Sequence, residues 1–567
     1  RIIQMITEGE NPKDIDRLLV MTFTRAAAAE MRERIQAAIE KKLESEPENE
    51  HLQQQAVLVQ FAQITTIDSF CLHIMREHFD RLDIDPAFRV GDEGEMLLMR
   101  ADVMDGLLED YYRDGGKRYE EFVDAYATGK ADDGIAEYVM QVYNFSQSNP
   151  WPDAWYEKCR EELLLTEQGE LEQTEWMQFL LRDIALQAQE WKIQLREAWE
   201  ICQETGGPMP YLPMIEEDLR HAEAVCGAAG SFETISEALE QFTFSRLAAI
   251  RGKNGEVDPE KKALVSDCRS RVKKAVEKLK GEYLFASPEQ MLADMEAGKE
   301  RILELLELAQ EFGRRFRAKK KEKNVVDFHD LEHFALEVLT GGSLDHRPGP
   351  VADELSEIYE EILVDEYQDS NEVQETLIRC VSRERFGTPN VFMVGDVKQS
   401  IYKFRLAKPE LFLEKYESYG KEDGLYQKIE LHKNFRSRPE VLSSINDVFY
   451  RIMTKQLGNI KYTDDAALYP GAEFPALPVD GQAKTEVLLL NTGDPLFDGM
   501  DEEKADYTAK EAEARLIAGE IKKLTDPEQG MKIFNGKTGE YEPLKKKDIV
   551  ILLRSLSGWS EEFLSVL

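Results

Sequence analysis

The chain begins with an alternation of short apolar runs and amphipathic stretches. Leu18 to Thr22 is an apolar, β-prone run. Thr24 stands where a helix N-cap belongs, and residues 25–35 are rich in Ala, Glu, Met and Arg, which are strong helix formers. The pattern predicts a strand, a tight turn and a helix in succession.

A long helical block follows. Residues 93–323 contain long amphipathic stretches, such as 188–199 and 291–316, and few clusters of β-branched residues. Strand signals return after the basic run 314–323. Residues 362–364 and 391–394 are short continuous apolar runs, which are typical of strands buried on both faces of a parallel sheet. We therefore expect a helical insert between two α/β pieces.

Loops divide the remaining sequence. Residues 341–350 start with Gly-Gly and end with Pro-Gly-Pro, which predicts a loop. Beyond residue 481, the strand-like runs 485–490 and 548–553 and the helical stretch 510–524 predict the start of a second α/β domain. The expected organisation is 1–92 and 325–468 for the two parts of a first α/β domain, 93–324 for the insert, 469–481 for a linker rich in Pro and Gly, and 482–567 for the second domain.

Composition indicates a globular protein of two to four domains. Hydrophobic residues make up 42% of the 567 residues, and no apolar run approaches the roughly 20 residues that cross a bilayer. Six scattered cysteines without a C-x-x-C pair argue against a disulfide framework, a zinc knuckle or an iron–sulfur site, so a reducing cytoplasm fits best. The opening Arg-Ile-Ile-Gln-Met-Ile resembles the middle of a helix, and we expect segments missing at both ends.

A formal net charge of −39 counts against a protein that holds nucleic acid by neutralising phosphates. An acidic shell can nevertheless leave one groove positive, because net charge governs solubility and steering rather than fold.

The strongest chemical signal is the run Ile-Leu-Val-Asp-Glu-Tyr-Gln-Asp at 362–369. A buried strand that ends in two acids presents carboxylates at the carboxyl edge of a sheet, where open α/β folds bind nucleotides. We expect Asp365 to hold Mg²⁺ through water and Glu366 to polarise an attacking water. Taken alone, the pair could simply end a strand.

Two more segments strengthen this interpretation. Residues 394–405 (Val-Gly-Asp-Val-Lys-Gln-Ser-Ile-Tyr-Lys-Phe-Arg) and 434–437 (Asn-Phe-Arg-Ser) each follow a strand. With the acid pair, and in this order, they resemble motifs II, III and IV of the superfamily 1 DNA helicases of the UvrD/Rep type. The resemblance implies a RecA-like P-loop NTPase sheet domain with a large helical insert, the start of a second RecA-like domain, and ATP with Mg²⁺ as ligands.

The resemblance also assigns roles. Gln399 is expected to sense the γ-phosphate, since an amide donates and accepts at once. Arg436 is expected to be an arginine finger, since a guanidinium fork matches charge on phosphoryl oxygens, and Phe435 to stack on adenine. Without its neighbours, Arg436 would be a plain surface cation.

Shorter segments resemble the DNA-contacting motifs of this family. Residues 22–31 resemble motif Ia, and residues 66–71 resemble the next motif, with Asp68 where many relatives have His. A helix N-terminus favours phosphate, and bases stack on aromatic rings. The expected DNA contacts are Thr22, Phe23, Thr24, Arg25, Thr66, Ser69, Phe404 and Arg405. Residues 327–331 (Asp-Phe-His-Asp-Leu) match a DFxDL signature that we interpret as structural, and the basic run before them could touch duplex DNA or be a solvated helix end.

Within the superfamily, segments 84–90, 395–407 and 548–554 resemble AddA-type helicase/nuclease subunits. Resemblance to that family implies ATP-driven 3′-to-5′ movement on single-stranded DNA, double-stranded DNA ends as substrate, a B-type partner subunit, repair of breaks by homologous recombination, and exonuclease activity in a longer parent. The G-x-x-x-x-G-K-[ST] loop is absent from the sequence, so we expect little ATP hydrolysis from this stretch alone. A stand-alone repair helicase and a non-catalytic scaffold subunit remain alternatives.

Overall fold

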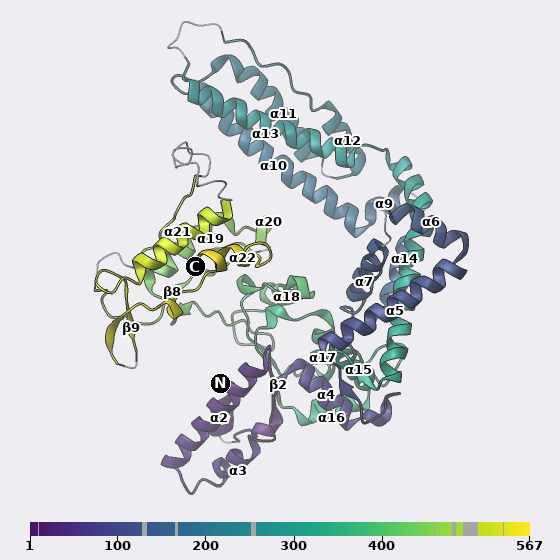
Figure 1. The fold of residues 1–567 in the computed structure, drawn as a ribbon, viewed down its shortest axis with the longest axis vertical. Helices are drawn as coiled ribbons and strands as arrows, with labels where there is room; N and C mark the ends of the chain where they lie inside the picture. The colour runs from purple at the N-terminus through teal and green to yellow at the C-terminus, as the bar shows by residue number, and fades with distance from the viewer. Residues whose placement is uncertain are drawn as a thin grey trace. The chain divides into compact units, whose positions relative to one another are not determined.

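A computed structural model describes residues 1–9, 11–127, 133–164, 168–228, 230–250, 257–458, 460–478, 483–491, 509–536 and 538–567. The chain forms two compact units, Arg1–Lys415 and Tyr416–Leu567 (Figure 1). Among the described residues, every helix is too short or too polar to cross a membrane.

A parallel sheet lies at the centre of the first unit. Its described strands are β1 (Leu18–Thr22), β2 (Gln63–Thr66), β5 (Glu361–Val364) and β6 (Val391–Met393), in the spatial order β2-β1-β5-β6. The predicted strands at 18–22 and 362–364 are confirmed. The expectation that 391–394 is buried on both faces is wrong, because β6 pairs only with β5 among the described strands and is half-buried at the sheet edge.

Helices cover both faces of this sheet. Alternate strand residues point to opposite faces, so Leu19 and Met21 pack on one side and Leu18 and Val20 on the other. The first face is covered by α4 (Ile67–Glu77), α15 (Phe328–Thr340), α16 (Pro350–Ile358) and α17 (Glu372–Val381). The second is covered by α1 (Ile2–Thr7), α2 (Arg25–Ser45) and α3 (Glu50–Leu58). The predicted N-cap is confirmed, since the Thr24 side chain accepts from the backbone N–H of Ala27.

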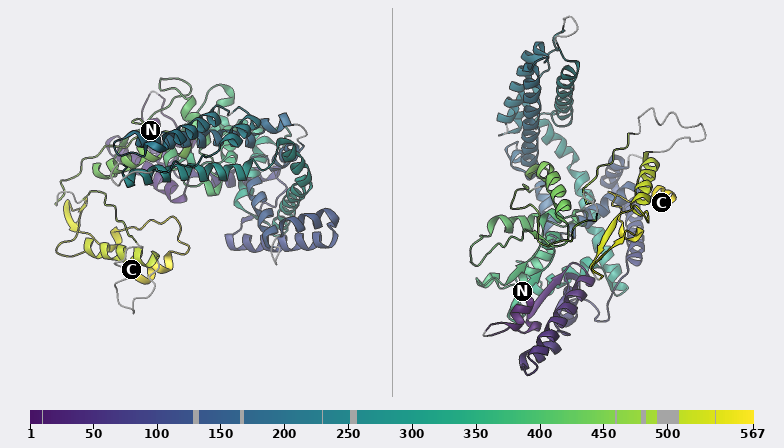
Figure 2. Two further views of the ribbon diagram at one scale, coloured as in Figure 1. Left: turned by 90° about the horizontal axis from the view of Figure 1, so that it is seen from above. Right: turned by 90° about the vertical axis from the view of Figure 1, so that its left-hand side faces the viewer.

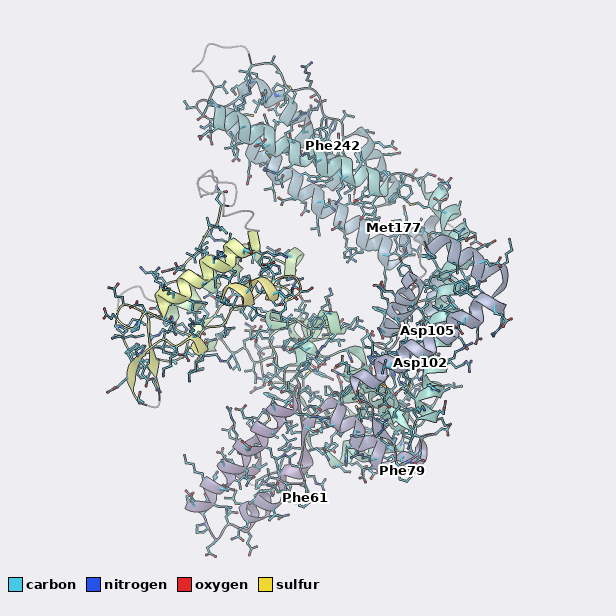
Figure 3. The ribbon with its side chains drawn as sticks, in the orientation of Figure 1. Phe61, Phe79, Asp102, Asp105, Met177 and Phe242 are labelled. Carbon is cyan, nitrogen blue, oxygen red and sulfur yellow. The ribbon has the colours of Figure 1, made fainter. Side chains whose placement is uncertain are left out.

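The predicted helical insert is confirmed. It consists of α5 (Glu93–Asp114), α6 (Gly116–Tyr126), α7 (Asp133–Ser146), α8 (Pro152–Glu162), α9 (Gln168–Gln173), α10 (Glu175–Gln203), α11 (Leu212–Gly227), α12 (Phe232–Gln241), α13 (Pro259–Tyr283) and α14 (Pro288–Glu322). Figure 2 shows the long helices α10 and α13 running side by side. Figure 3 labels Met177 and Phe242, which are buried in the core of this bundle, and the exposed Asp102 and Asp105 on α5.

The insert joins the sheet unit through a short parallel pair, β3 (Arg89–Val90) and β4 (Val325–Val326). Next to this pair, Asp327 and Asp330 form a capping box at the start of α15. The buried Lys320 lies 3.0 Å from Asp327 and 2.6 Å from Asp330, so its charge is neutralised inside the protein. This contact supports the structural interpretation of the DFxDL signature.

Much of the basic run 314–323 is also paired with acids. Arg314 lies 2.6 Å from Glu311, and Arg315 lies 2.7 Å from Asp110. These ion pairs leave little of the run's charge for duplex DNA, which favours the solvated helix end.

The second unit is smaller. It contains β7 (Lys433–Asn434), α19 (Pro439–Ile452), α20 (Lys455–Gly458), β8 (Tyr469–Pro470), α21 (Ala509–Leu524), β9 (Lys532–Asn535), β10 (Glu540–Pro543) and α22 (Ser560–Val566), and α18 (Glu410–Ser418) spans the division between the units. The predicted helix 510–524 is confirmed as α21. The strand predictions for 485–490 and 548–553 are wrong for the described chain, because no described segment pairs with either run and residues such as Leu489 and Leu552 are exposed. The ladder that does form is the hairpin β9–β10.

Candidate functional site

Four chemically distinctive segments leave the sheet at the same edge. The strands are parallel and end in register: Thr22 lies opposite Thr66, Met21 opposite Val364, and Val364 opposite Met393. The segments with the motif residues follow these strand ends directly. The tertiary structure therefore gathers residues from 22–25, 66–69, 365–369 and 394–399 along one carboxyl edge, where ligands bind in open α/β sheets.

The two acids stand just past β5. The Asp365 backbone N–H donates to the Met21 carbonyl at 3.0 Å, which ties the acid to the central strand β1. Burial and then the negative charge of Glu366 raise the pKa of Asp365. A cation at this carboxylate would offset both effects. Glu366 is exposed and has a φ of +51°, a left-handed conformation that is uncommon outside glycine and is often found at functional sites.

Gln368 links the acid pair to the next segment of the edge. Its side chain is 1% exposed, and its Nε2 donates to Glu366 Oε2 at 2.7 Å. Its Oε1 accepts from the Asp396 backbone N–H at 2.9 Å. One buried amide thus fixes both the Glu366 carboxylate and the loop after β6. Sequence reasoning missed this residue, although its position inside the acidic run was the available signal.

Gly395 is required beside this amide. A Cβ at Gly395 would lie 2.5 Å from Gln368 Oε1 and 3.3 Å from the Gln368 backbone nitrogen, too close without a shift of the loop. We expect Gly395→Ala to lower the free energy of unfolding by about 1–3 kcal/mol, the usual cost of overpacking. Urea unfolding of the purified chain measures this change.

Gly106→Ala is the matched control. This glycine lies inside helix α5, and an added Cβ meets nothing within 4 Å. The substitution should leave stability unchanged or raise it by about 0.5–1 kcal/mol, because alanine favours helix interiors. Equal effects at both glycines would contradict the tight contact at Gly395.

Gln399 follows the loop after β6. Its Nε2 donates to Asp396 Oδ2 at 2.9 Å, and the Lys398 ammonium lies 2.7 Å from Asp396 Oδ1. The Gln399 side chain is exposed, so its amide is accessible to a ligand at the edge. The Asp396 carboxylate thereby orients both an amide and a cation beside the acid pair.

The segment after β1 presents exposed groups at a helix N-terminus. Phe23, Thr24 and Arg25 are exposed, whereas Thr22 is buried and its hydroxyl donates to the Thr24 carbonyl at 3.0 Å. After β2, Thr66 is likewise buried as the N-cap of α4 and shares a hydrogen bond with the half-buried hydroxyl of Ser69 at 2.9 Å. The two buried threonines fix their turns, and direct ligand contact by either stays a prediction.

Aromatic rings connect the β1 segment with the β6 segment. The ring centroids of Phe23 and Tyr402 are 4.7 Å apart, and those of Tyr402 and Phe404 are 5.9 Å apart. The Arg405 guanidinium lies 5.5 Å from the Tyr402 centroid and 5.6 Å from that of Phe404. Phe404 is 76% exposed, so the cluster offers flat faces for stacking. Tyr402 was missed from sequence, although it lies two positions before Phe404.

The motif of the second unit forms a compact turn. Asn434 Oδ1 accepts from the backbone N–H groups of Arg436 at 2.9 Å and Ser437 at 2.8 Å. This turn presents Phe435 and Arg436 as exposed side chains, and the Phe435 ring packs on the Gly471 backbone. A groove of about 850 Å³ lies alongside, lined by 438–440 and 470–477.

The donor set at the acid pair fits magnesium better than a metal held only by protein. Among the described residues, no cluster of three or more His, Cys, Asp or Glu could enclose an ion. Mg²⁺ is typically bound by one or two carboxylates and completes its shell with water and substrate phosphates. Asp365, partly buried and unpaired with any described cation, matches that pattern.

Known proteins similar to this chain point the same way. The family model described as UvrD/REP helicase N-terminal domain matches residues 1–420. Proteins named as the A component of an ATP-dependent helicase/nuclease align over the whole chain: 44% identical from Lachnoclostridium phytofermentans, 41% from Clostridium botulinum and 38% from Bacillus velezensis. The chain covers 43%, 46% and 45% of those relatives, so it spans less than half of their length.

Proposed function

Because this chain belongs to the UvrD/REP helicase N-terminal domain family, we propose that it is the motor part of an ATP-dependent DNA helicase that acts in DNA repair. The observation that carries this proposal is the shared carboxyl edge. Residues suited to a nucleotide follow β5 and β6, and residues suited to DNA follow β1 and β2, on adjacent parallel strands. One rigid sheet can then connect hydrolysis with movement of a strand.

The acid pair has the chemistry for the hydrolytic step. Glu366, oriented by Gln368, accepts a proton from the attacking water. Asp365 holds magnesium through water, and the bound ion neutralises charge on the phosphates. Gln399 hydrogen-bonds to the terminal phosphate and reports its presence to the loop after β6.

The second unit supplies two further groups in this proposal. Arg436 stabilises negative charge that develops on the transferred phosphoryl oxygens, and Phe435 stacks on the adenine ring. Both side chains are exposed on a rigid Asx turn, which supports these roles.

Single-stranded DNA is proposed to bind along the other half of the edge. Bases stack on Phe23, Tyr402 and Phe404, while Arg25, Arg405 and the N-termini of α2 and α4 meet phosphates. Ser69 and the backbone around Thr66 complete the path. Stacking accounts for affinity in a chain with a net charge of −39, since rings bind bases without adding positive charge.

The finer assignments follow the relatives named as helicase/nuclease A components. We propose 3′-to-5′ movement, a role in homologous recombination at double-stranded DNA ends, a B-type partner subunit, exonuclease activity in the full-length protein, and a cytoplasmic location. We also propose residues 1–92 and 325–468 as a first RecA-like domain, 93–324 as its insert, 469–481 as a linker and 482–567 as the start of a second RecA-like domain.

The test is ATP hydrolysis by the full-length protein with and without single-stranded DNA. A rate that rises with DNA supports the motor. Tyr402→Ala should weaken DNA binding by about 1–3 kcal/mol per lost stack, and Tyr402→Phe should restore it. Fluorescence anisotropy of a labelled oligonucleotide measures this affinity.

Phe61→Ala is the control for the DNA arm. Phe61 is 74% exposed but precedes β2, at the amino end of that strand (Figure 3). Its loss should leave DNA affinity unchanged. DNA binding without any ATP hydrolysis would favour the scaffold alternative, and unwinding without a nuclease in the full-length protein would favour the stand-alone helicase.

A further inference from the structure

Glu332 is a buried carboxyl group that contacts the start of α17. It lies on α15 and is 5% exposed. The Gln374 side-chain amide donates to Glu332 Oε1 at 2.8 Å. Asn371, whose side chain caps α17 by accepting from the Gln374 backbone N–H, also hydrogen-bonds to Glu332. Glu332 therefore holds the first turn of the helix that follows the acid pair.

On its other side Glu332 faces α4, which carries the segment after β2. Asp68, in the first turn of α4, is near enough for its charge to raise the pKa of Glu332. The positive charge of Arg25, at the start of α2, acts on Asp68 in turn and opposes the rise in the Asp68 pKa that burial causes. The buried Cys71 thiol also faces both carboxyls, which raise its pKa. A chain of charged and polar groups thus runs from the exposed turn after β1 to α17.

The protonation state of Glu332 decides how this chain behaves. Burial, the largest cause, raises the pKa of Glu332 to about 7, against the lowering effect of the hydrogen bonds from Gln374 and Asn371. Below that pH the neutral carboxyl can donate a hydrogen bond, and the Asp68 carboxylate can accept one. Above it, two negative charges share a buried site and repel each other, which loosens the contact between α4 and α15.

We propose that Glu332 is a positioning residue that couples the DNA-facing segments after β1 and β2 to the hydrolytic segment after β5. The coupling rests on the proposed function of both segments. When Arg25 turns to a DNA phosphate, it no longer offsets the charge of Asp68. The Asp68–Glu332 pair then holds its proton more tightly, so DNA binding and the state of this buried pair are linked.

The experiment measures the ratio of ATP hydrolysis with single-stranded DNA to hydrolysis without it, in the full-length protein, from about pH 6 to about pH 9. For the wild type, the ratio should fall about five-fold or more as the pH rises through the range in which Glu332 ionises. Glu332→Gln keeps a neutral side chain at every pH and should hold the ratio at the wild-type acidic value. Glu332→Ala should give a low ratio throughout.

Glu337→Gln is the matched control, because Glu337 is an exposed acid on the same helix. It should reproduce the wild-type pH profile. A Glu332→Gln protein with the wild-type profile, or normal stimulation in Glu332→Ala, would overturn the coupling role alone. A wild type that hydrolyses no ATP at any pH, with or without DNA, would overturn the proposed function as well.

Discussion

Glu366→Gln in the full-length protein is expected to lower the turnover of ATP by about 10²–10⁴-fold, the usual contribution of a positioned general base. The amide cannot accept the proton of the attacking water. Nucleotide affinity should change little, because Gln368 and the strand geometry remain in place and the substituted side chain keeps the same size. Steady-state hydrolysis and equilibrium binding of a fluorescent nucleotide separate the two effects.

Glu354→Gln tests whether loss of any surface acid would do the same. Glu354 is exposed on α16, in the same unit, and lies outside the edge segments. This variant should retain wild-type turnover. Normal hydrolysis by Glu366→Gln would reject Glu366 as the base and would move attention to Asp369, whose pKa is raised by burial and by the neighbouring Glu366 charge.

Arg436→Ala is expected to lower turnover by about 10³–10⁵-fold, the range found for arginine fingers. The guanidinium stabilises charge in the transition state more than in the bound nucleotide, so kcat should fall far more than affinity. Arg436→Lys should recover little, because an ammonium lacks the planar fork that matches two phosphoryl oxygens. Single-turnover hydrolysis measures the chemical step directly.

Arg451→Ala provides the comparison within the second unit. Arg451 is an exposed arginine on α19 whose partner, Asp447, lies 3.0 Å away one helical turn earlier. Such surface pairs contribute about 0–1 kcal/mol, so neither turnover nor stability should change measurably. If the Arg436 variant behaved like this control, Arg436 would be an ordinary surface cation.

Several local features of this protein were predictable because they depend on neighbours in sequence. The strand at 18–22, the Thr24 cap and the helical insert follow from apolar period and from capping chemistry, and the structure confirms them. Prediction failed at 485–490 and 548–553 because an apolar run becomes a strand only when another segment pairs with it.

The site shows the same division. The sequence alone identified Asp365, Glu366, Gln399 and Arg436 as candidates, because residue type and spacing resemble a known motor. It did not reveal Gln368 or Glu332 as links, since each acts through contacts with residues far along the chain. Gln368 meets the backbone of Asp396, and Glu332 meets Gln374 and Asp68.

What the sequence determined by itself is the identity of the chemical groups and the helices and strands that carry them. What only the tertiary structure decided is which groups share an edge and which buried side chains join them. The physical reason is that parallel neighbours in a sheet come from distant segments. Only folding brings the ends of β2, β1, β5 and β6 into register, with the buried Gln368 amide and the buried Glu332 carboxyl group beside them.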